Sequence, residues 1–146
     1  MKTLIIGYGN PLRRDDGFGG VIIETLKAKP AEGMEFTQTQ QLVPELAEDV
    51  SQASQVIFVD ASVDGIPGQV KVRPVTAGER PAPKYTHYVA PQELLGMADL
   101  LYGHQPEAWL ITVTGEDFGL GEGLSQEVEK QIPEVLAVIQ SIKRSG

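Results

Sequence analysis

The residues best suited to chemistry are two aspartates and one histidine that lie far apart along the chain. Asp16 follows a glycine-rich turn, Asp60 ends an apolar run, and His87 stands between two tyrosines in KYTHYVAP. Two carboxylates and one imidazole suit a borderline divalent ion such as Zn²⁺, Ni²⁺ or Fe²⁺. The three side chains are therefore predicted to form one site if the fold brings them together.

Each of these residues also has a purely structural interpretation. Asp15 or Asp16 could cap the helix that follows, because helix N-termini favour acidic side chains. Asp60 could hydrogen-bond its own backbone at the end of a strand, and His87 could be an ordinary packed or solvated side chain. The pair Asp64-Gly65 indicates a turn and no chemistry.

Apolar runs predict the strands that would position these residues. The runs at 3–7, 54–62 and 107–115 are almost continuously apolar, which is typical of strands buried on both faces. The stretch 33–40 is interpreted as another strand. The segment Gln69–Val75 alternates between apolar and polar residues, which favours an antiparallel strand at the edge of the sheet.

Amphipathic stretches between the strands predict helices. Their ranges are 17–29, 43–53, 90–103 and 125–146. Ser125 is the expected N-cap of the last helix, and Pro133 is expected to kink or break it.

The alternation of strands and helices predicts an α/β fold with one domain over residues 1–146. We expect a three-layer αβα sandwich around a twisted, mostly parallel five-stranded sheet with one antiparallel edge strand. In such folds, sites form beyond the carboxyl ends of the strands. Asp16, Asp60 and His87 converge there if the strand at 69–75 is antiparallel.

Composition excludes several classes of function. The 146 residues carry a net charge of -8, which argues against a general nucleic-acid binder. The absence of cysteine excludes disulfides, cysteine zinc sites and thiol catalysis. No apolar run approaches the ~20 residues that a membrane span needs, and the N-terminal apolar stretch is too short for a signal peptide. We therefore expect a cytoplasmic protein that binds neither membrane nor nucleic acid.

Familiar catalytic and nucleotide motifs are missing. The turn GYGNPL supplies Gly-x-Gly, but Leu12 stands where a dinucleotide fingerprint needs its third glycine, and two aspartates follow. The sequence contains no Gly-x-Ser-x-Gly, His-Glu-x-x-His or phosphate-binding loop. A second glycine-rich stretch, EDFGLGEGLS at 116–125, indicates a loop that is mobile or closely approached.

Four segments resemble one known family in the right order along nearly the whole chain. LIIGYGNPLRRDDGFG resembles the opening of the hydrogenase maturation endopeptidases, which has an apolar strand, Gly-x-Gly-Asn, a pair of acids and Gly-x-Gly. VIFVDAS is similar to their strand ending in Asp-Ala. THYVAPQELLGMADLLYG resembles their histidine segment, and WLITVTGEDFGLGEGLS their last strand and loop.

The resemblance implies an endopeptidase of the aspartyl protease type. It would remove the C-terminal extension of a nickel-iron hydrogenase large-subunit precursor after nickel insertion. The family's metal-contacting residues correspond to Asp16, Asp60 and His87, which are also the implied catalytic residues. The nickel would be supplied by the substrate, with no tightly bound cofactor, and the protein is expected to be a monomer.

The sequence is also compatible with two other functions. The same three ligands would serve a non-enzymatic nickel-binding or carrier module of hydrogenase assembly. A nucleotide-binding regulator is a further possibility that the incomplete Gly-x-Gly turn does not favour.

Overall fold

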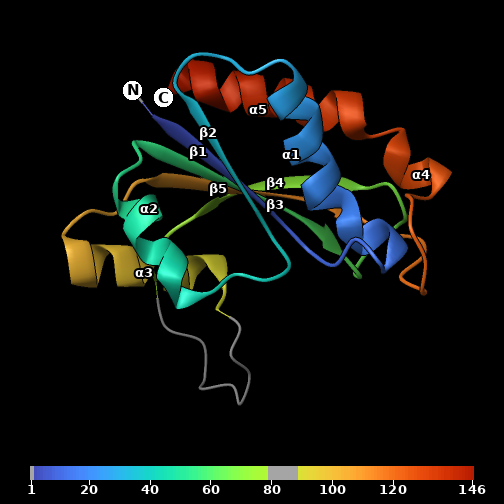
Figure 1. Ribbon diagram of the computed structural model, residues 1–146, viewed down its shortest axis with the longest axis horizontal. Helices are drawn as coiled ribbons and strands as arrows, with labels where there is room; N and C mark the ends of the chain where they lie inside the picture. Colours follow the sequence, from blue (N-terminus) through green and yellow to red (C-terminus); the bar gives the residue numbers. More distant parts are fainter. Residues whose placement is uncertain (1, 79–88) are drawn as a thin grey trace.

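A computed structural model describes residues 2–78 and 89–146 of the chain, which form a five-stranded sheet between helices (Figure 1). The strands are β1 (Thr3–Tyr8), β2 (Met34–Thr39), β3 (Gln55–Ser62), β4 (Val70–Val75) and β5 (Glu107–Thr114). Their order across the sheet is β2-β1-β3-β5-β4. β4 pairs antiparallel with β5, and the other pairs are parallel. The predicted antiparallel edge strand is therefore confirmed.

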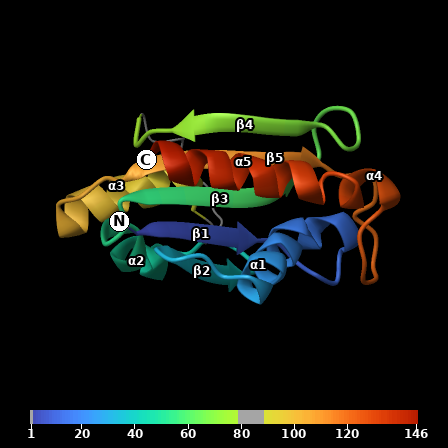
Figure 2. The ribbon, with the colours of Figure 1, turned by 90° about the horizontal axis from the view of Figure 1, so that it is seen from above.

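Helices cover both faces of the sheet. The helices are α1 (Phe18–Ala28), α2 (Ala47–Ser51), α3 (Pro91–Tyr102), α4 (Gln126–Glu129) and α5 (Ile132–Ser145), with short 3-10 turns η1 (Arg14–Gly17) and η2 (Pro44–Leu46). α1 and α5 lie on one face, whereas α2 and α3 lie on the other (Figures 1 and 2). The expected three-layer α/β sandwich is confirmed.

Alternating side chains of the central strands build two cores. On β3, Val56 and Phe58 pack with residues of α2 and α3, and Ile57 and Val59 pack with residues of α1 and α5. All four side chains are fully buried. A strand buried on both faces needs apolar residues at every position, which explains the continuous apolar run.

Two predicted helices are shorter than expected. The stretch 43–53 gives only a 3-10 turn at Pro44–Leu46 and one turn of α2, and the stretch 125–146 is divided between α4 and α5. Pro133 lies in the first turn of α5, where its missing N–H costs nothing. The break that Pro133 predicted is therefore confirmed, and it begins a new helix there.

A buried polar network secures the amino end of the sheet. The Gln55 side chain accepts a hydrogen bond from the Thr3 hydroxyl (2.9 Å) and donates one to the Ile142 carbonyl (3.1 Å). We expect Gln55→Ala to lower the free energy of unfolding by about 1–3 kcal/mol, because it leaves the buried Thr3 hydroxyl without its acceptor and removes one donor to the Ile142 carbonyl. Urea unfolding measures this change, and a loss below about 0.5 kcal/mol would contradict it.

Within residues 2–78 and 89–146, none of the helices has the length and apolar character that a bilayer span requires.

Candidate active site

A tight turn after β1 begins the candidate site. Gly9 has a φ of +138°, and a Cβ built there would overlap the main-chain carbonyl oxygen of Asp16. The chain therefore folds back so closely that glycine is required at this position. The same close approach brings the Asp16 carboxylate over the turn, where its Oδ2 accepts a 2.7 Å hydrogen bond from the Asn10 N–H. Asp16 is half-buried.

Asp60 lies at the same edge, on the last residues of β3. Its carboxylate is half-buried and accepts a 2.8 Å hydrogen bond from the Ala61 N–H. Burial raises the pKa of Asp60 to about 7, and the negative charge of Asp16 adds to the increase, whereas hydrogen bonds from Ala61 and Tyr8 oppose it. The electrostatic effect of Asp16 indicates that the two carboxylates lie near each other. A carboxyl group with this pKa exchanges protons near neutral pH.

Tyr8 is a member of the site that sequence reasoning missed. Its side chain lies on the same face of β1 as Leu4 and Ile6 and packs against the core that α2 and α3 cover. Asp60 projects toward this same face of the sheet. Burial and the adjacent Asp60 charge both raise the pKa of Tyr8, while the positive charge of Arg73 on β4 opposes them. Tyr8 therefore stays protonated, with its hydroxyl near the Asp60 carboxylate. A tyrosine at the end of an apolar strand has no distinctive sequence signal.

The third predicted ligand, His87, lies outside the described residues. Among residues 2–78 and 89–146, no three histidine, aspartate or glutamate side chains are grouped so that they could hold a metal ion. The other histidine, His104, contacts the Ala53 carbonyl (3.0 Å) just before β3 begins, at the opposite end of the sheet from Asp60. Asp16 and Asp60 are thus the two predicted site residues that the structure brings together.

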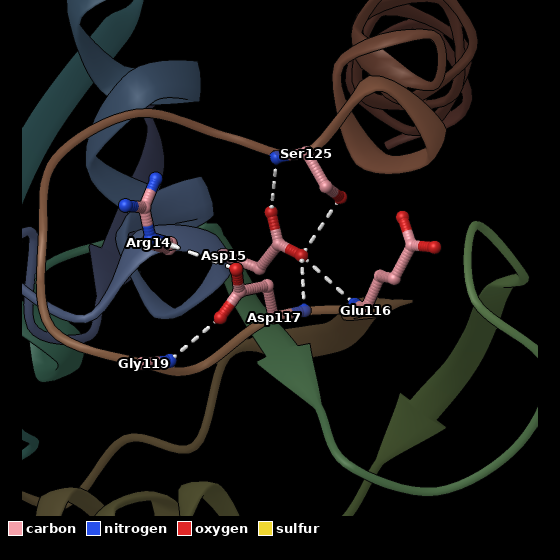
Figure 3. Close-up of polar contacts among 6 residues, drawn as sticks. All are labelled: Arg14, Asp15, Glu116, Asp117, Gly119 and Ser125. Carbon is pink, nitrogen blue, oxygen red and sulfur yellow. Dashed lines mark hydrogen bonds and ion pairs between the residues drawn. The ribbon is translucent and has the colours of Figure 1, made fainter.

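The glycine-rich loop after β5 is attached to the same turn through Asp15. The Asp15 carboxylate is fully buried and accepts hydrogen bonds from the N–H groups of Glu116 (2.8 Å), Asp117 (2.9 Å) and Ser125 (2.7 Å) and from the Ser125 hydroxyl (2.8 Å). Figure 3 shows Asp15 between the two ends of this loop. Burial acts to raise the pKa of Asp15, but the four hydrogen bonds outweigh it and hold the pKa below its usual value.

These contacts correct two expectations about caps. Neither η1 nor α1 has a side-chain cap, so Asp15 and Asp16 do not cap the helix that follows. Ser125 occupies the N-cap position of α4 without a capping hydrogen bond, because its hydroxyl donates to Asp15. Arg14 forms an ion pair with Asp117 (Nε to Oδ2, 3.6 Å).

Solved structures resemble this chain over its whole length. The hydrogenase maturating endopeptidase HybD from E. coli matches with a TM-score of 0.75 and 25% identity, covering 100% of this chain and 94% of that one. An endopeptidase from Escherichia coli matches with a TM-score of 0.71 and 26% identity over 100% and 94% of the two chains. These structures confirm the predicted resemblance to the hydrogenase maturation endopeptidases.

The fold is also shared by a more distant protease of this family. The [NiFe] hydrogenase maturation protease HybD from Thermococcus kodakarensis has a TM-score of 0.76 at 23% identity, covering 97% of this chain and 99% of that one. No protein-family model and no curated protein matches the sequence. The structural relatives are named as peptidases, so this protein is a peptidase and the carrier alternative is not favoured.

A groove of about 460 Å³ adjoins the peptidase's η1 turn on the side of α1 and α5. Pro11, Val21, Leu124 and Ile132 supply its apolar lining, and Arg14 is among its polar residues. Asp60 projects toward the opposite face, with α2 and α3, as its alternation with Val56 and Phe58 indicates. The groove therefore lies beside η1, but neither Asp16 nor Asp60 lines it.

Proposed function

We propose that this peptidase removes the C-terminal extension of a nickel-loaded nickel-iron hydrogenase large-subunit precursor. The observation that carries the proposal is the pairing of Asp16 with Asp60, whose pKa is raised to about 7, at the carboxyl edge of the sheet. The family supplies the reaction class. The identity of the substrate, a nickel-loaded precursor with a C-terminal tail, is what we propose beyond this reaction class.

The nickel belongs to the substrate in this proposal. Asp16, Asp60 and His87 contact the ion that the precursor already carries, and the peptidase holds no cofactor of its own. Two carboxylates and an imidazole are suitable ligands for Ni²⁺. An ion near the scissile amide would polarise its carbonyl and lower the pKa of a water molecule. Recognition of nickel would also restrict cleavage to loaded precursors.

Asp60 is the better candidate for the general base. In the free enzyme its pKa is about 7, so about half of its carboxylate groups are ionised at neutral pH and still basic enough to accept a proton. The water oxygen adds to the scissile carbonyl carbon while its proton passes to Asp60. Asp60 then returns this proton to the leaving nitrogen, and the C–N bond breaks. The products are a mature C-terminal carboxylate and a released peptide.

A cleavage assay tests the proposal. Nickel-loaded and nickel-free large-subunit precursor are each incubated with the wild type, with Asp16→Asn and with the control Asp64→Asn. Asp64 lies at the same edge, and within residues 2–78 and 89–146 its hydrogen bonds come from its main chain, as an acceptor for Thr114 and a donor to Ser62. We expect loss of C-terminal mass only with nickel, and only with the wild type and Asp64→Asn. Equal cleavage of nickel-free precursor would contradict nickel recognition, and full activity of Asp16→Asn would contradict the site.

The Tyr8 hydroxyl near Asp60 predicts a change in pH dependence. Because this hydroxyl acts to lower the pKa of Asp60, Tyr8→Phe should raise that pKa and move the rising limb of the kcat/KM profile to higher pH. The control is Tyr102→Phe, since Tyr102 is 50% exposed at the end of α3. A Tyr8→Phe profile that coincides with the Tyr102→Phe profile would show that the Tyr8 hydroxyl does not tune Asp60.

A further inference from the structure

We propose that Asp15 is a positioning residue, whose buried carboxylate holds Asp16 in its working place by tying η1 to the loop at 115–125. The inference rests on the proposed function for the role of Asp16, but its structural part can be tested without cleavage. Asp15 belongs to the same 3-10 turn as Asp16, but the two carboxylates accept hydrogen bonds from different segments of the chain. The two neighbouring acids therefore have separate tasks.

The contacts of Asp15 all reach one distant segment. Four hydrogen bonds of 2.7–2.9 Å arrive from residues 101, 102 and 110 positions later in the chain. None comes from the helix that follows it. A fully buried carboxylate is stable only when it is hydrogen-bonded in this way. Figure 3 shows that the side chain is enclosed by the two ends of the loop.

Main-chain contacts bring the loop against the residues around Asp15. The Arg14 N–H donates to the Gly121 carbonyl (3.0 Å), the Gly121 N–H to the Leu12 carbonyl (2.9 Å), and the Asp15 N–H to the Asp117 carbonyl (3.0 Å). Arg14 has a φ of +48°, the only positive value among the non-glycine residues that the structure describes. Such a conformation persists only where the surroundings enforce it.

Asp16 depends on this arrangement because it is the next residue in the turn. Its carboxylate accepts a 2.7 Å hydrogen bond from the Asn10 N–H. A rotation of η1 that releases Asp15 from the loop would also change the direction of the Asp16 side chain. Misplacement of a working group by about 1 Å is enough to reduce a rate on the order of 10²-fold.

The Asn10 amide supplies a direct reporter of this position. Its proton is hydrogen-bonded to Asp16 Oδ2, so its NMR chemical shift and exchange rate depend on where that carboxylate lies. The comparison uses the wild type, Asp15→Asn, Ser125→Ala and the control Gln55→Ala. Asparagine turns part of the Asp15 acceptor surface into a donor facing other donors, whereas Ser125→Ala removes one of the four hydrogen bonds. Gln55→Ala removes a buried polar network at the other end of the sheet.

We expect the Asn10 amide signal to move and its exchange to accelerate in Asp15→Asn, with a smaller change in Ser125→Ala. Gln55→Ala should leave the signal of the folded protein unchanged even though it lowers stability. If Asp15→Asn does not fold, Ser125→Ala carries the comparison. An unchanged Asn10 amide in every folded Asp15 or Ser125 variant would overturn the inference.

Kinetics provide the second test, with the activity expressed per folded molecule. Asp15→Asn should lower kcat about 10–100-fold with KM within about twofold, because the tail still binds while Asp16 is misplaced. The double variant Asp15→Asn/Asp16→Asn should be no slower than Asp16→Asn alone, since Asp15 acts through Asp16. Multiplying effects in the double variant would overturn the inference. A wild type that cleaves nothing would instead contradict the proposed function, and the Asn10 comparison would still decide the role of Asp15.

Discussion

Asp60→Asn is expected to abolish most of the cleavage activity and, at the same time, to stabilise the folded protein above neutral pH. Loss of a general base typically costs about 10²–10⁴-fold in rate. The amide keeps the size of the side chain and an oxygen that can still accept from the Ala61 N–H. The loss should therefore reflect chemistry and not a collapse of the site.

The gain in stability follows from the direction of the pKa shift. Burial and the charge of Asp16 raise the pKa of Asp60 from 3.8 to about 7, so the folded state holds this proton more tightly than the unfolded chain. The contribution of Asp60 to stability is fully present below pH 4 and is lost as the pH rises toward 7. Asparagine stays neutral at every pH, so the variant does not lose this free energy of unfolding as the pH rises. We expect a gain of about 1–3 kcal/mol at pH 8, discounted for partial exposure to water.

Urea unfolding at pH 4 and pH 8 measures this difference directly. The wild type and Asp60→Asn should have similar free energies of unfolding at pH 4, where both side chains are neutral, and should diverge at pH 8. Asp64→Asn is the control, because Asp64 is exposed at the same edge. Equal effects of Asp60→Asn at the two pH values would contradict the raised pKa, and normal cleavage would contradict its role as the base.

Local sequence carried enough information to predict the sheet. The apolar runs of β1, β3 and β5 each end in polar or glycine residues, and this pattern identifies buried parallel strands without knowledge of their neighbours. The rule that sites form at carboxyl strand ends then predicted that Asp16 and Asp60 would meet. The first prediction depends on apolar patterns within short segments, and the second adds the general rule about strand ends. His87 stays a prediction, because it lies outside the described residues.

The role of Asp15 could not be predicted in this way. Its partners Glu116, Asp117 and Ser125 are more than 100 positions away, and three of its four contacts come from main-chain N–H groups that no side-chain pattern reveals. An acidic residue before a helix is most often an N-cap, so the local sequence predicted a capping role for Asp15. Ser125 does occupy the predicted N-cap position of α4, but its hydroxyl donates to the distant Asp15 carboxylate and makes no capping hydrogen bond. A fully buried charge next to a candidate ligand is visible only in three dimensions.

Gly9→Ala is expected to have the second large effect, because Gly9 sets the geometry of the Asp16 turn. Gly9 has a φ of +138°, and an added Cβ would overlap the Asp16 carbonyl oxygen, so both the backbone and η1 would have to move. We expect a loss of about 2–4 kcal/mol in the free energy of unfolding. The 2.7 Å hydrogen bond between the Asn10 N–H and Asp16 should be broken or lengthened, and kcat should fall about 10²-fold.

Gly103→Ala separates the overlap with Asp16 from the general cost of a positive φ. Gly103 follows α3 with a φ of +76°, and a Cβ there would meet nothing within 4 Å. Alanine at that position should cost about 1 kcal/mol of stability and leave cleavage unchanged, because only the backbone preference is lost. Urea unfolding and kcat of the two variants form the comparison. If Gly9→Ala behaves like Gly103→Ala in both measurements, the turn after β1 does not position Asp16, and the close approach of the two residues is incidental to activity.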